Sequence, residues 1–514
     1  MRLLLVAATL VLAGCQAPVH DLEEISIADL HDRMQRGEIS SEQATAWYLE
    51  RIETIDRSGP ALRSVLEVNP DALTTARALD EEWQVSGPRG PLHGVPVILK
   101  GNIDTADRMA TSAGSIALRD HRPAEDAFLV KRLRDAGAVI LGKANLSEWA
   151  NFRSTMSSSG WSSLGGQTRN PYDVARNPCG SSSGSGVAVA ANLTAVAVGT
   201  ETDGSIMCPS GMNGIVGIKP TLGLISRSGI IPIAHSQDTA GPMARSVRDA
   251  ALLLSAMTGT DADDPASREL DAAAVDYTAN LAADGLEGRR IGVLRNYFGA
   301  GNHPLVDAAF TRSIGALEAA GAEVVDGIEL DLGNAGSHEY AVLLHEFKHD
   351  LAAYLEASDA SFGTLAELIA FNNANSAEVM PLFGQEIFLA AEATGGLDTD
   401  AYREALTESK RLAQTALDEA FSGERLDAIV APTNGPAWMT DHVNGDSFSV
   451  GSSRYAAISG YPSVTVPAGF ERGLPLGLSF IGPPLSERTL IELAYAFEQA
   501  TLARRPPDLE ASSP

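Results

Sequence analysis

The sequence is poor in basic residues, and lysine is scarcer than arginine. Its 514 residues include 38 Lys and Arg against 66 Asp and Glu, which gives a formal net charge of -28. A surface of that sign repels the phosphate backbone of nucleic acids, so we expect no DNA or RNA partner. Lysine occupies only six positions, and Lys100, which ends an apolar run, therefore stands out.

Cysteine is nearly absent as well, which excludes a fold held together by many disulfides. The 3 cysteines are Cys15, Cys179 and Cys208. Cys179 and Cys208 each lie close in sequence to a cluster of serines, so folding could bring them together. Two cysteines are weak evidence for a bond, and we expect free thiols.

Long apolar runs are missing, apart from one at the N-terminus that is too short to span a membrane, Leu3 to Ala13. It ends Leu-Ala-Gly-Cys15, which resembles the lipobox of bacterial lipoproteins. That resemblance implies cleavage before Cys15, lipidation of Cys15 and export. Gln16, in place of Asp, implies sorting to the outer membrane. An ordinary signal peptide with a chance cysteine is the alternative.

The rest of the chain alternates helical and strand patterns, which is typical of an α/β fold with a helix-covered, parallel sheet. Strands on both sides of a helical insert at 338–420 favour one domain over two. We expect a tether at 16–25, the domain at 26–505 and a tail at 506–514. The expected helices lie within 27–55, 124–136, 187–198, 307–320 and 487–501, and the expected strands at 95–99, 138–141, 290–294, 426–432, 463–467 and 476–481.

The stretch from Asn177 to Thr221 carries two clusters of serine and glycine separated by an apolar run. In the first cluster, Gly-Ser-Ser182-Ser-Gly matches the G-x-S-x-G pattern of a nucleophile elbow. Such an elbow follows a buried strand, whereas a turn-rich loop precedes Ser182. A phosphate-binding loop is also weakly supported, because no Gly-Lys-Ser/Thr follows the glycines.

Two other hydrolytic patterns are present. His345-Glu346-Phe-Lys-His349 matches H-E-x-x-H, in which two histidines one helical turn apart bind zinc and the glutamate acts as base. A solvated or partly buried helix face is the simpler interpretation of that short motif. The second pattern pairs Ser205, after Gly204, with a lysine base, since burial of Lys100 would lower its pKa. A surface lysine with a buried stem is the alternative for Lys100.

Three segments resemble the amidase signature family. They are Gly94 to Ile103, Gly180 to Ser185 and Thr200 to Pro220, and weaker similarity extends in order from about residue 25 to 505. The resemblance implies a single α/β domain with a mixed, mostly parallel, twisted sheet covered by helices on both faces. It also implies an amidase that forms an acyl-enzyme and needs no cofactor and no metal.

Residue by residue, the resemblance implies a triad of Ser205 as nucleophile, Ser181 as the bridging serine after a cis peptide bond, and Lys100 as base. The oxyanion is expected among the backbone N–H groups of Thr202, Asp203, Gly204 and Ser205.

Glu-Thr-Asp-Gly-Ser205 is a variant that resembles peptide amidases, which remove C-terminal amides from peptides. Met207 and Cys208 follow the nucleophile, with no arginine to bind a substrate carboxylate, so we expect a neutral or cationic amide as substrate. Membrane contact is expected through the lipid anchor only. The alternatives are a zinc peptidase using residues 345–349, an amidotransferase A-subunit-like protein, and a non-catalytic binding protein.

Overall fold

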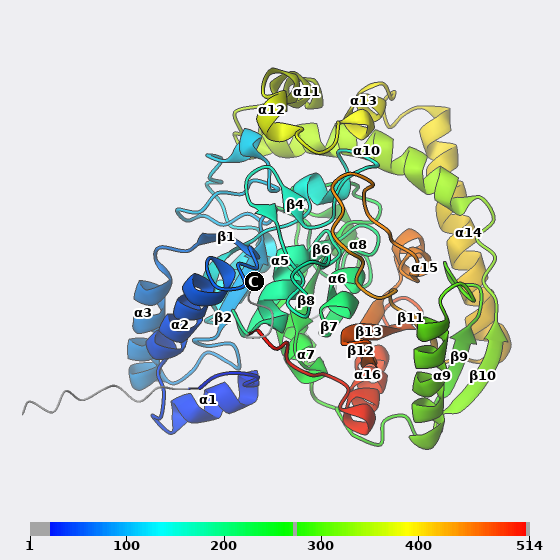
Figure 1. Cartoon of the computed structure of the whole chain (residues 1–514), viewed down its shortest axis with the longest axis horizontal. Helices are drawn as coiled ribbons and strands as arrows, with labels where there is room; N and C mark the ends of the chain where they lie inside the picture. Colours follow the sequence, from blue (N-terminus) through cyan, green and yellow to red (C-terminus); the bar gives the residue numbers. More distant parts are fainter. Residues whose placement is uncertain (1–20, 271–274, 510–514) are drawn as a thin grey trace, which may run out of the picture.

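The computed structural model describes residues 21–270 and 275–509. They form one domain in which helices cover both faces of a large mixed sheet, as expected for the α/β fold (Figure 1). The predicted signal peptide and lipidated Cys15 lie outside the described residues. Within the described ranges, no helix combines the length and the apolar character that crossing a bilayer requires.

Eleven strands of the described residues join one sheet, in the order β1-β3-β2-β6-β8-β7-β12-β13-β11-β9-β10, and β4 and β5 form a separate pair. Their bounds are β1 Val65–Val68, β2 Pro96–Lys100, β3 Val139–Ala144, β4 Trp161–Ser162, β5 Gly166–Gln167, β6 Val196–Glu201, β7 Val216–Lys219, β8 Thr239–Ala244, β9 Arg290–Leu294, β10 Glu323–Ile328, β11 Ala428–Pro432, β12 Ser463–Glu471 and β13 Leu474–Ile481.

The helices connect and cover these strands. They are α1 Ile27–Gln35, α2 Ser41–Arg51, α3 Ala72–Ser86, α4 Phe128–Asp135, α5 Ser183–Ala190, α6 Met207–Met212, α7 Val247–Met257, α8 Pro265–Leu270, α9 Pro304–Ala319, α10 Ala335–Ala357, α11 Leu365–Ala374, α12 Ser376–Val379, α13 Glu386–Glu392, α14 Asp400–Glu424, α15 Arg454–Ser459 and α16 Glu487–Thr501. Single turns of π or 3-10 helix occupy Ile52–Asp56, Ile116–Leu118 and Glu148–Asn151.

The expectation of a mostly parallel sheet is wrong. Four neighbouring pairs in the described sheet are parallel, and six are antiparallel. One cause is the hairpin of β12 and β13, which a two-residue turn of Arg472 and Gly473 closes. Both turn residues have positive φ, +51° and +82°, as the tight turns of antiparallel hairpins require.

The expectation of one helix from 187 to 198 is also wrong. The helix α5 begins earlier, at Ser183, and ends at Ala190, and the segment ends in strand β6, which begins at Val196. The turn between them passes through Asn192, whose φ is +57°. An asparagine tolerates this left-handed conformation better than most residues, so it ends the helix and lets Val196 start a buried strand.

The insert contributes α10 to α14, which form an arc of helices over one end of the sheet (Figure 1). Helices α10 and α14 pack along each other. A separate apolar cluster joins α10, α11 and α13 to the body of the domain through Trp149, Phe152, Ile231 and Ile233. The insert is therefore part of the single domain, and its first helix lies close to the loops that follow β6.

Candidate active site

The site forms where two neighbouring parallel strands, β2 and β6, end. Leu99 of β2 pairs with Val198 of β6, so the next residues along both strands lie at the same edge of the sheet. Lys100 is the last residue of β2, and Ser205 follows β6 by four residues. Side chains at the carboxyl ends of parallel strands commonly form the ligand sites of α/β sheets.

Lys100 is completely buried, and its amine has three partners. Nζ donates to the carbonyl oxygen of Thr200 (3.0 Å) and lies within hydrogen-bond distance of Thr200 Oγ1 (2.8 Å) and Ser181 Oγ (2.7 Å). Burial lowers the pKa of Lys100 to about 7, although the charges of Asp238 and Glu201 oppose the shift. Near neutral pH, a large fraction of Lys100 is therefore an uncharged amine.

An uncharged amine has two N–H donors and one lone pair. The carbonyl of Thr200 can only accept, and Thr200 Oγ1 also accepts a hydrogen bond from Asn102 Nδ2 (3.1 Å). If both donors of Lys100 point to Thr200, the lone pair is left for the hydroxyl of Ser181. This arrangement makes Lys100 a base that can take a proton from Ser181. The sequence did not identify Thr200 and Asn102 as functional residues. Their positions next to the ends of β2 and β6 were the signal that could have identified them.

Ser181 lies on the glycine-rich loop before α5, after a cis peptide bond between Gly180 and Ser181. The backbone N–H of Ser182 donates to the carbonyl of Ser205 (3.1 Å), which joins this loop to the loop of the second serine. Gly184 lets the same segment pack against the chain after β3, because a Cβ there would lie 2.4 Å from the carbonyl oxygen of Asn145. The structure thus brings Lys100, Ser181 and the loop of Ser205 together.

Ser182, the centre of the elbow-like pattern, has a different environment. Its hydroxyl donates to the carbonyl of Thr200 (3.0 Å) and accepts from the N–H of the same residue (3.2 Å). The side chain is completely buried. Both of its contacts are to the backbone of β6, so Ser182 holds the glycine-rich loop against the strand.

A disulfide joins Cys179 to Cys208, so the expectation of free thiols is wrong. Cys179 precedes Ser181 by two residues, and Cys208 follows Ser205 by three. The Cα atoms lie 6.0 Å apart, because the fold places the two loops side by side. The bond therefore fixes the two serine-bearing loops to each other, and sequence spacing alone did not show that contact.

The backbone N–H groups of the turn from Thr202 to Ser205, where the sequence predicts the oxyanion site, are free in the described part of the structure. Within the described residues, no group accepts a hydrogen bond from the backbone N–H of any of these four residues. Gly204 has a φ of +79°, and a Cβ on it would lie 2.9 Å from Ser453 Oγ. Free N–H groups on a fixed turn can stabilise the negative oxygen of a tetrahedral intermediate.

Glu201 is a further residue of the site that the sequence did not single out as functional. Its Oε2 accepts hydrogen bonds from the backbone N–H groups of Ile206 (2.7 Å) and Met207 (2.9 Å), directly after Ser205. Burial raises the pKa of Glu201, whereas the nearby charge of Lys219 opposes the shift. Glu201 thus positions the backbone that carries Ser205. Its signal in the sequence was an acidic residue at the end of an apolar run.

A cavity of about 430 Å³ opens beside the partners of Lys100. Asn102, Thr200 and Thr202 form its inner wall, whereas Lys100, Ser181 and Ser205 themselves do not line it. The outer wall comes from the loop 227–239, the loop 263–265 and helix α10. An amide that occupies this cavity would lie next to Thr200, which contacts the amine of Lys100.

Acidic side chains are frequent around the cavity. Burial raises the pKa of Asp238 to about 6, while hydrogen bonds from Thr202 Oγ1 (2.5 Å) and the N–H groups of Ile233 and Ala234 oppose the shift. The cavity's arginine, Arg227, is paired with Asp264. A substrate carboxylate therefore finds no unpaired arginine among the described residues that line this cavity.

Glu339 of helix α10 in the insert is connected through Gln237 to the turn at Thr202. Gln237 Nε2 bridges Glu339 Oε1 (3.0 Å) and the carbonyl of Thr202 (3.3 Å). Burial, together with the charge of the neighbouring Asp203, raises the pKa of Glu339 to about 8. Asp203 in turn accepts a hydrogen bond from Ser453 (2.5 Å). The insert therefore contacts the turn that precedes Ser205.

The zinc motif at 345–349 does not form the predicted site. Within residues 21–270 and 275–509, neither His345 nor His349 belongs to a group of three donors that could share an ion. Glu346 is completely buried, His349 is exposed, and His345 packs against Tyr402. The motif's residues thus point into different environments, which contradicts a peptidase site built from both histidines.

Comparison with known proteins identifies relatives along almost the whole chain. A profile of the family described as Amidase matches residues 43–491. A probable amidase of Arabidopsis thaliana is 42% identical over 498 residues, which cover 95% of this chain and 92% of the relative. The A-subunit of the glutamyl-tRNA(Gln) amidotransferase of Moorella thermoacetica is 37% identical, with 95% and 99% covered.

Solved structures give the same picture. The native peptide amidase of Stenotrophomonas maltophilia is 52% identical and superposes with a TM-score of 0.92, covering 95% of this chain and 99% of that one. A structure of the peptide amidase PAM with the competitive inhibitor chymostatin is similar at 53% identity and a TM-score of 0.92, with the same coverage.

Proposed function

We propose that this chain, which belongs to the amidase family, removes C-terminal amides from peptides through an acyl-enzyme on Ser205. Membership of the family makes it an amidase, a hydrolase of linear amide bonds. The triad, the substrate and the place of action are our proposals.

One observation carries the proposed mechanism: a buried lysine with a lowered pKa lies 2.7 Å from a serine hydroxyl on the loop bonded to that of Ser205. A lysine amine becomes a general base when it loses its charge near neutral pH. A serine alone is a weak nucleophile and needs such a base.

The proposed reaction begins with attack of Ser205 Oγ on the amide carbonyl carbon. The Ser205 proton passes to Ser181, and the Ser181 proton passes to Lys100 Nζ. The carbonyl oxygen becomes negative and receives hydrogen bonds from the N–H groups between Thr202 and Ser205. When the carbon–nitrogen bond breaks, the proton returns through Ser181 to the leaving amine. Water then attacks the ester by the same route, which releases the acid and restores Ser205.

Two observations support a peptide amide as substrate. The peptide amidase of Stenotrophomonas maltophilia is 52% identical over nearly the whole chain. The cavity is lined by carboxylates, and its Arg227 is already paired, which suits a neutral terminal amide or a cationic peptide better than a free carboxylate.

The test is a comparison of peptide amides, simple aliphatic or aryl amides and free glutamine as substrates of the purified chain. We expect the highest kcat/KM for peptide amides, with release of one ammonia per acid formed. A preference for simple amides would contradict the substrate but leave the amidase assignment intact. A preference for glutamine would favour the amidotransferase-like alternative.

We also propose that the chain is exported and anchored to the outer membrane through lipidated Cys15. The disulfide between Cys179 and Cys208 supports an oxidising compartment, where such bonds persist. Mass spectrometry of the mature N-terminus tests the proposal. We expect an acylated Cys15 as the first residue, and an unmodified start beyond Cys15 would contradict lipidation while remaining compatible with export.

A further inference from the structure

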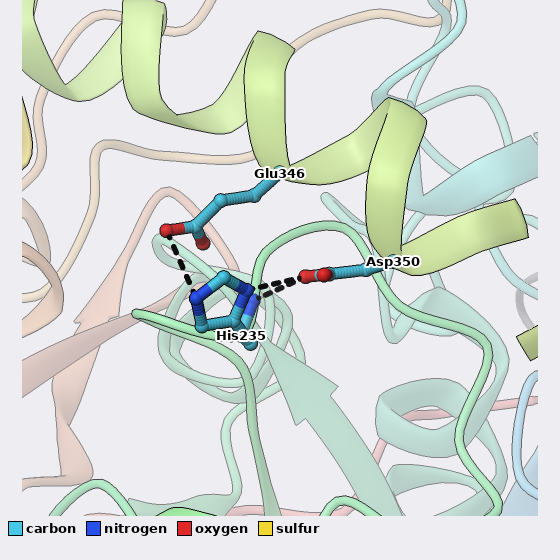
Figure 2. Close-up of side chains that lie close together, drawn as sticks. All are labelled: His235, Glu346 and Asp350. Carbon is cyan, nitrogen blue, oxygen red and sulfur yellow. Dashed lines mark hydrogen bonds and ion pairs between the residues drawn. The ribbon is translucent and has the colours of Figure 1, made fainter. Parts of the chain in front are cut away.

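A histidine and two carboxylates lie close together beside the cavity, where His235 and Asp350 line the wall and Glu346 is buried behind it (Figure 2). His235 lies in the loop before β8, and Glu346 and Asp350 lie one turn apart on α10. One donor atom of each residue lies within 4.8 Å of the other two. In the described part of the chain, this is the one group of three histidine, cysteine or acidic side chains close enough to share an ion.

The imidazole of His235 has a fixed orientation. Asp350 Oδ2 accepts hydrogen bonds from both the backbone N–H and Nδ1 of His235, each 2.8 Å long (Figure 2). This contact leaves Nε2 facing the carboxylate of Glu346. An acidic residue that holds the far nitrogen of an imidazole is the usual support of a histidine that binds a metal.

The gap between His235 and Glu346 has the width that an ion needs. Nε2 lies 3.5 Å from Glu346 Oε1, which is longer than a good N–H···O hydrogen bond. Two ligands that are each about 2.0–2.1 Å from a tetrahedral zinc ion lie about 3.3 Å apart. The distance between the two donor atoms is therefore closer to that of two zinc ligands than to that of a hydrogen bond.

The carboxylate of Glu346 is also held from behind. It is completely buried, with Oε2 accepting the N–H of Ser236 (2.9 Å) and Oε1 accepting the hydroxyl of Tyr402 (2.7 Å). The side chain of His235, in contrast, is 45% exposed. Glu346 is thus fixed on the protein side, and His235, which lines the cavity, is the exposed member of the pair.

We propose that His235 Nε2 and Glu346 Oε1 bind a divalent transition-metal ion such as Zn²⁺, with Asp350 orienting the imidazole and water completing the coordination. An imidazole with a carboxylate is a donor set that suits zinc. The ion links the loop before β8 to α10, so it stabilises the outer wall of the cavity. This site is separate from the amidase mechanism and uses only the glutamate of the H-E-x-x-H motif.

Isothermal titration of the purified full chain, without a polyhistidine tag, with Zn²⁺ tests the proposal. We expect one ion per chain, loss of that binding in His235→Ala and Glu346→Gln, and binding about tenfold weaker in Asp350→Asn. His349→Ala is the matched control, because His349 contacts Asp350 Oδ1 (3.1 Å) but is not a proposed ligand, and it should bind as the wild type does. Since His235 is exposed, His235→Ala keeps the test valid if Glu346→Gln fails to fold.

Three outcomes would overturn the proposal. If the wild type binds no Zn²⁺, or if His235→Ala binds it unchanged, the three residues are an ion-pair network only. If His349→Ala loses the ion and His235→Ala retains it, the histidines of the sequence motif are the ligands instead.

Discussion

Lys100 Nζ lies 2.7 Å from Ser181 Oγ, although 81 residues separate the two in the sequence. The contact exists because β2 and β6 are neighbouring parallel strands and the glycine-rich loop folds back over their ends. It places the amine of a buried lysine next to a serine hydroxyl, which is the arrangement that the proposed mechanism requires. The expected consequences concern pH, stability and the separate roles of three serines.

The pH profile should report the protonation of Lys100. Only the uncharged amine can accept a proton, and the pKa of Lys100 is about 7, so kcat/KM should fall tenfold per pH unit below about pH 7. Rates with a neutral peptide amide between pH 5 and 9 measure this limb. A rate that stays constant down to pH 5 would contradict a neutral lysine base.

Replacement of Asp238 should shift the part of the pH profile in which kcat/KM falls toward low pH, the acid limb. The charge of Asp238 raises the pKa of Lys100, so Asp238→Asn should move the acid limb to lower pH. Asp263→Asn, an exposed carboxylate at the outer wall of the cavity, is the control and should leave the limb in place. A limb that moves equally in both variants would mean that general surface charge, rather than Lys100, sets the profile.

The same lysine should make the protein less stable than a variant without it. The folded-state pKa is lowered from 10.5 to about 7, so between these values the unfolded chain binds more protons and wild-type stability rises with pH. Lys100→Met removes this dependence. Its gain in free energy of unfolding over the wild type should be largest at or below pH 7 and shrink by up to about 1.4 kcal/mol per pH unit above it.

Denaturant unfolding at pH 7 and pH 9 gives the two differences, and exposed Lys131→Met serves as control. The other buried lysines occur in both proteins, so their contributions cancel. A difference between Lys100→Met and wild type that is the same at both pH values would show that Lys100 is charged in the folded state.

Ser181 and Ser182 are adjacent and both buried, but their contacts predict opposite effects of replacement. Ser181→Ala should reduce kcat by at least about a hundredfold with little loss of stability, because in the proposed mechanism its hydroxyl carries the proton. Ser182→Ala should lower the free energy of unfolding by about 1–3 kcal/mol, because it breaks two hydrogen bonds to Thr200. Steady-state kinetics and denaturant unfolding of both variants separate the roles, and the reverse pattern would support the elbow interpretation.

The disulfide should contribute both stability and activity. It closes a loop with a sequence separation of 29 residues, for which the loss of chain entropy in the unfolded state is worth about 3–4 kcal/mol. The Cys179→Ala/Cys208→Ala double variant should therefore unfold at lower denaturant and show a lower kcat, since the loops of Ser181 and Ser205 are no longer linked. Thiol titration of the denatured, unreduced wild type should find no free Cys179 or Cys208. Two free thiols would contradict the bond.

The sequence predicted the α/β class, the single domain and many of the helices and strands, because these follow from local periodicity and turn residues. Strand β2, for example, is apolar up to Lys100, and α16 has a regular buried face. The order of the strands depends on contacts between distant segments. The antiparallel majority could therefore not be read from the pattern, and neither could the division of 187–198 at Asn192, where a run of small apolar residues fits helix and strand equally.

The residues proposed for the triad came from a resemblance to a family, not from their chemistry alone. The sequence favoured neither burial nor exposure of Lys100, because a lysine at a strand end is exposed as often as it is buried. Thr200, Asn102 and Glu201, which hold Lys100 and the backbone after Ser205, lie near strand ends whose pairing the sequence does not show. The contact between Cys179 and Cys208 likewise depends on the pairing of distant segments, which the sequence does not show.

Labelling with a fluorophosphonate tests the central claim most directly. The reagent reacts with an activated serine, and peptide mass spectrometry identifies the modified residue. We predict one adduct per chain, on Ser205, formed far more slowly in Lys100→Ala and absent in Ser205→Ala. An adduct on Ser182 or Ser181, or a Lys100→Ala variant that reacts as fast as the wild type, would contradict the Ser205–Ser181–Lys100 mechanism.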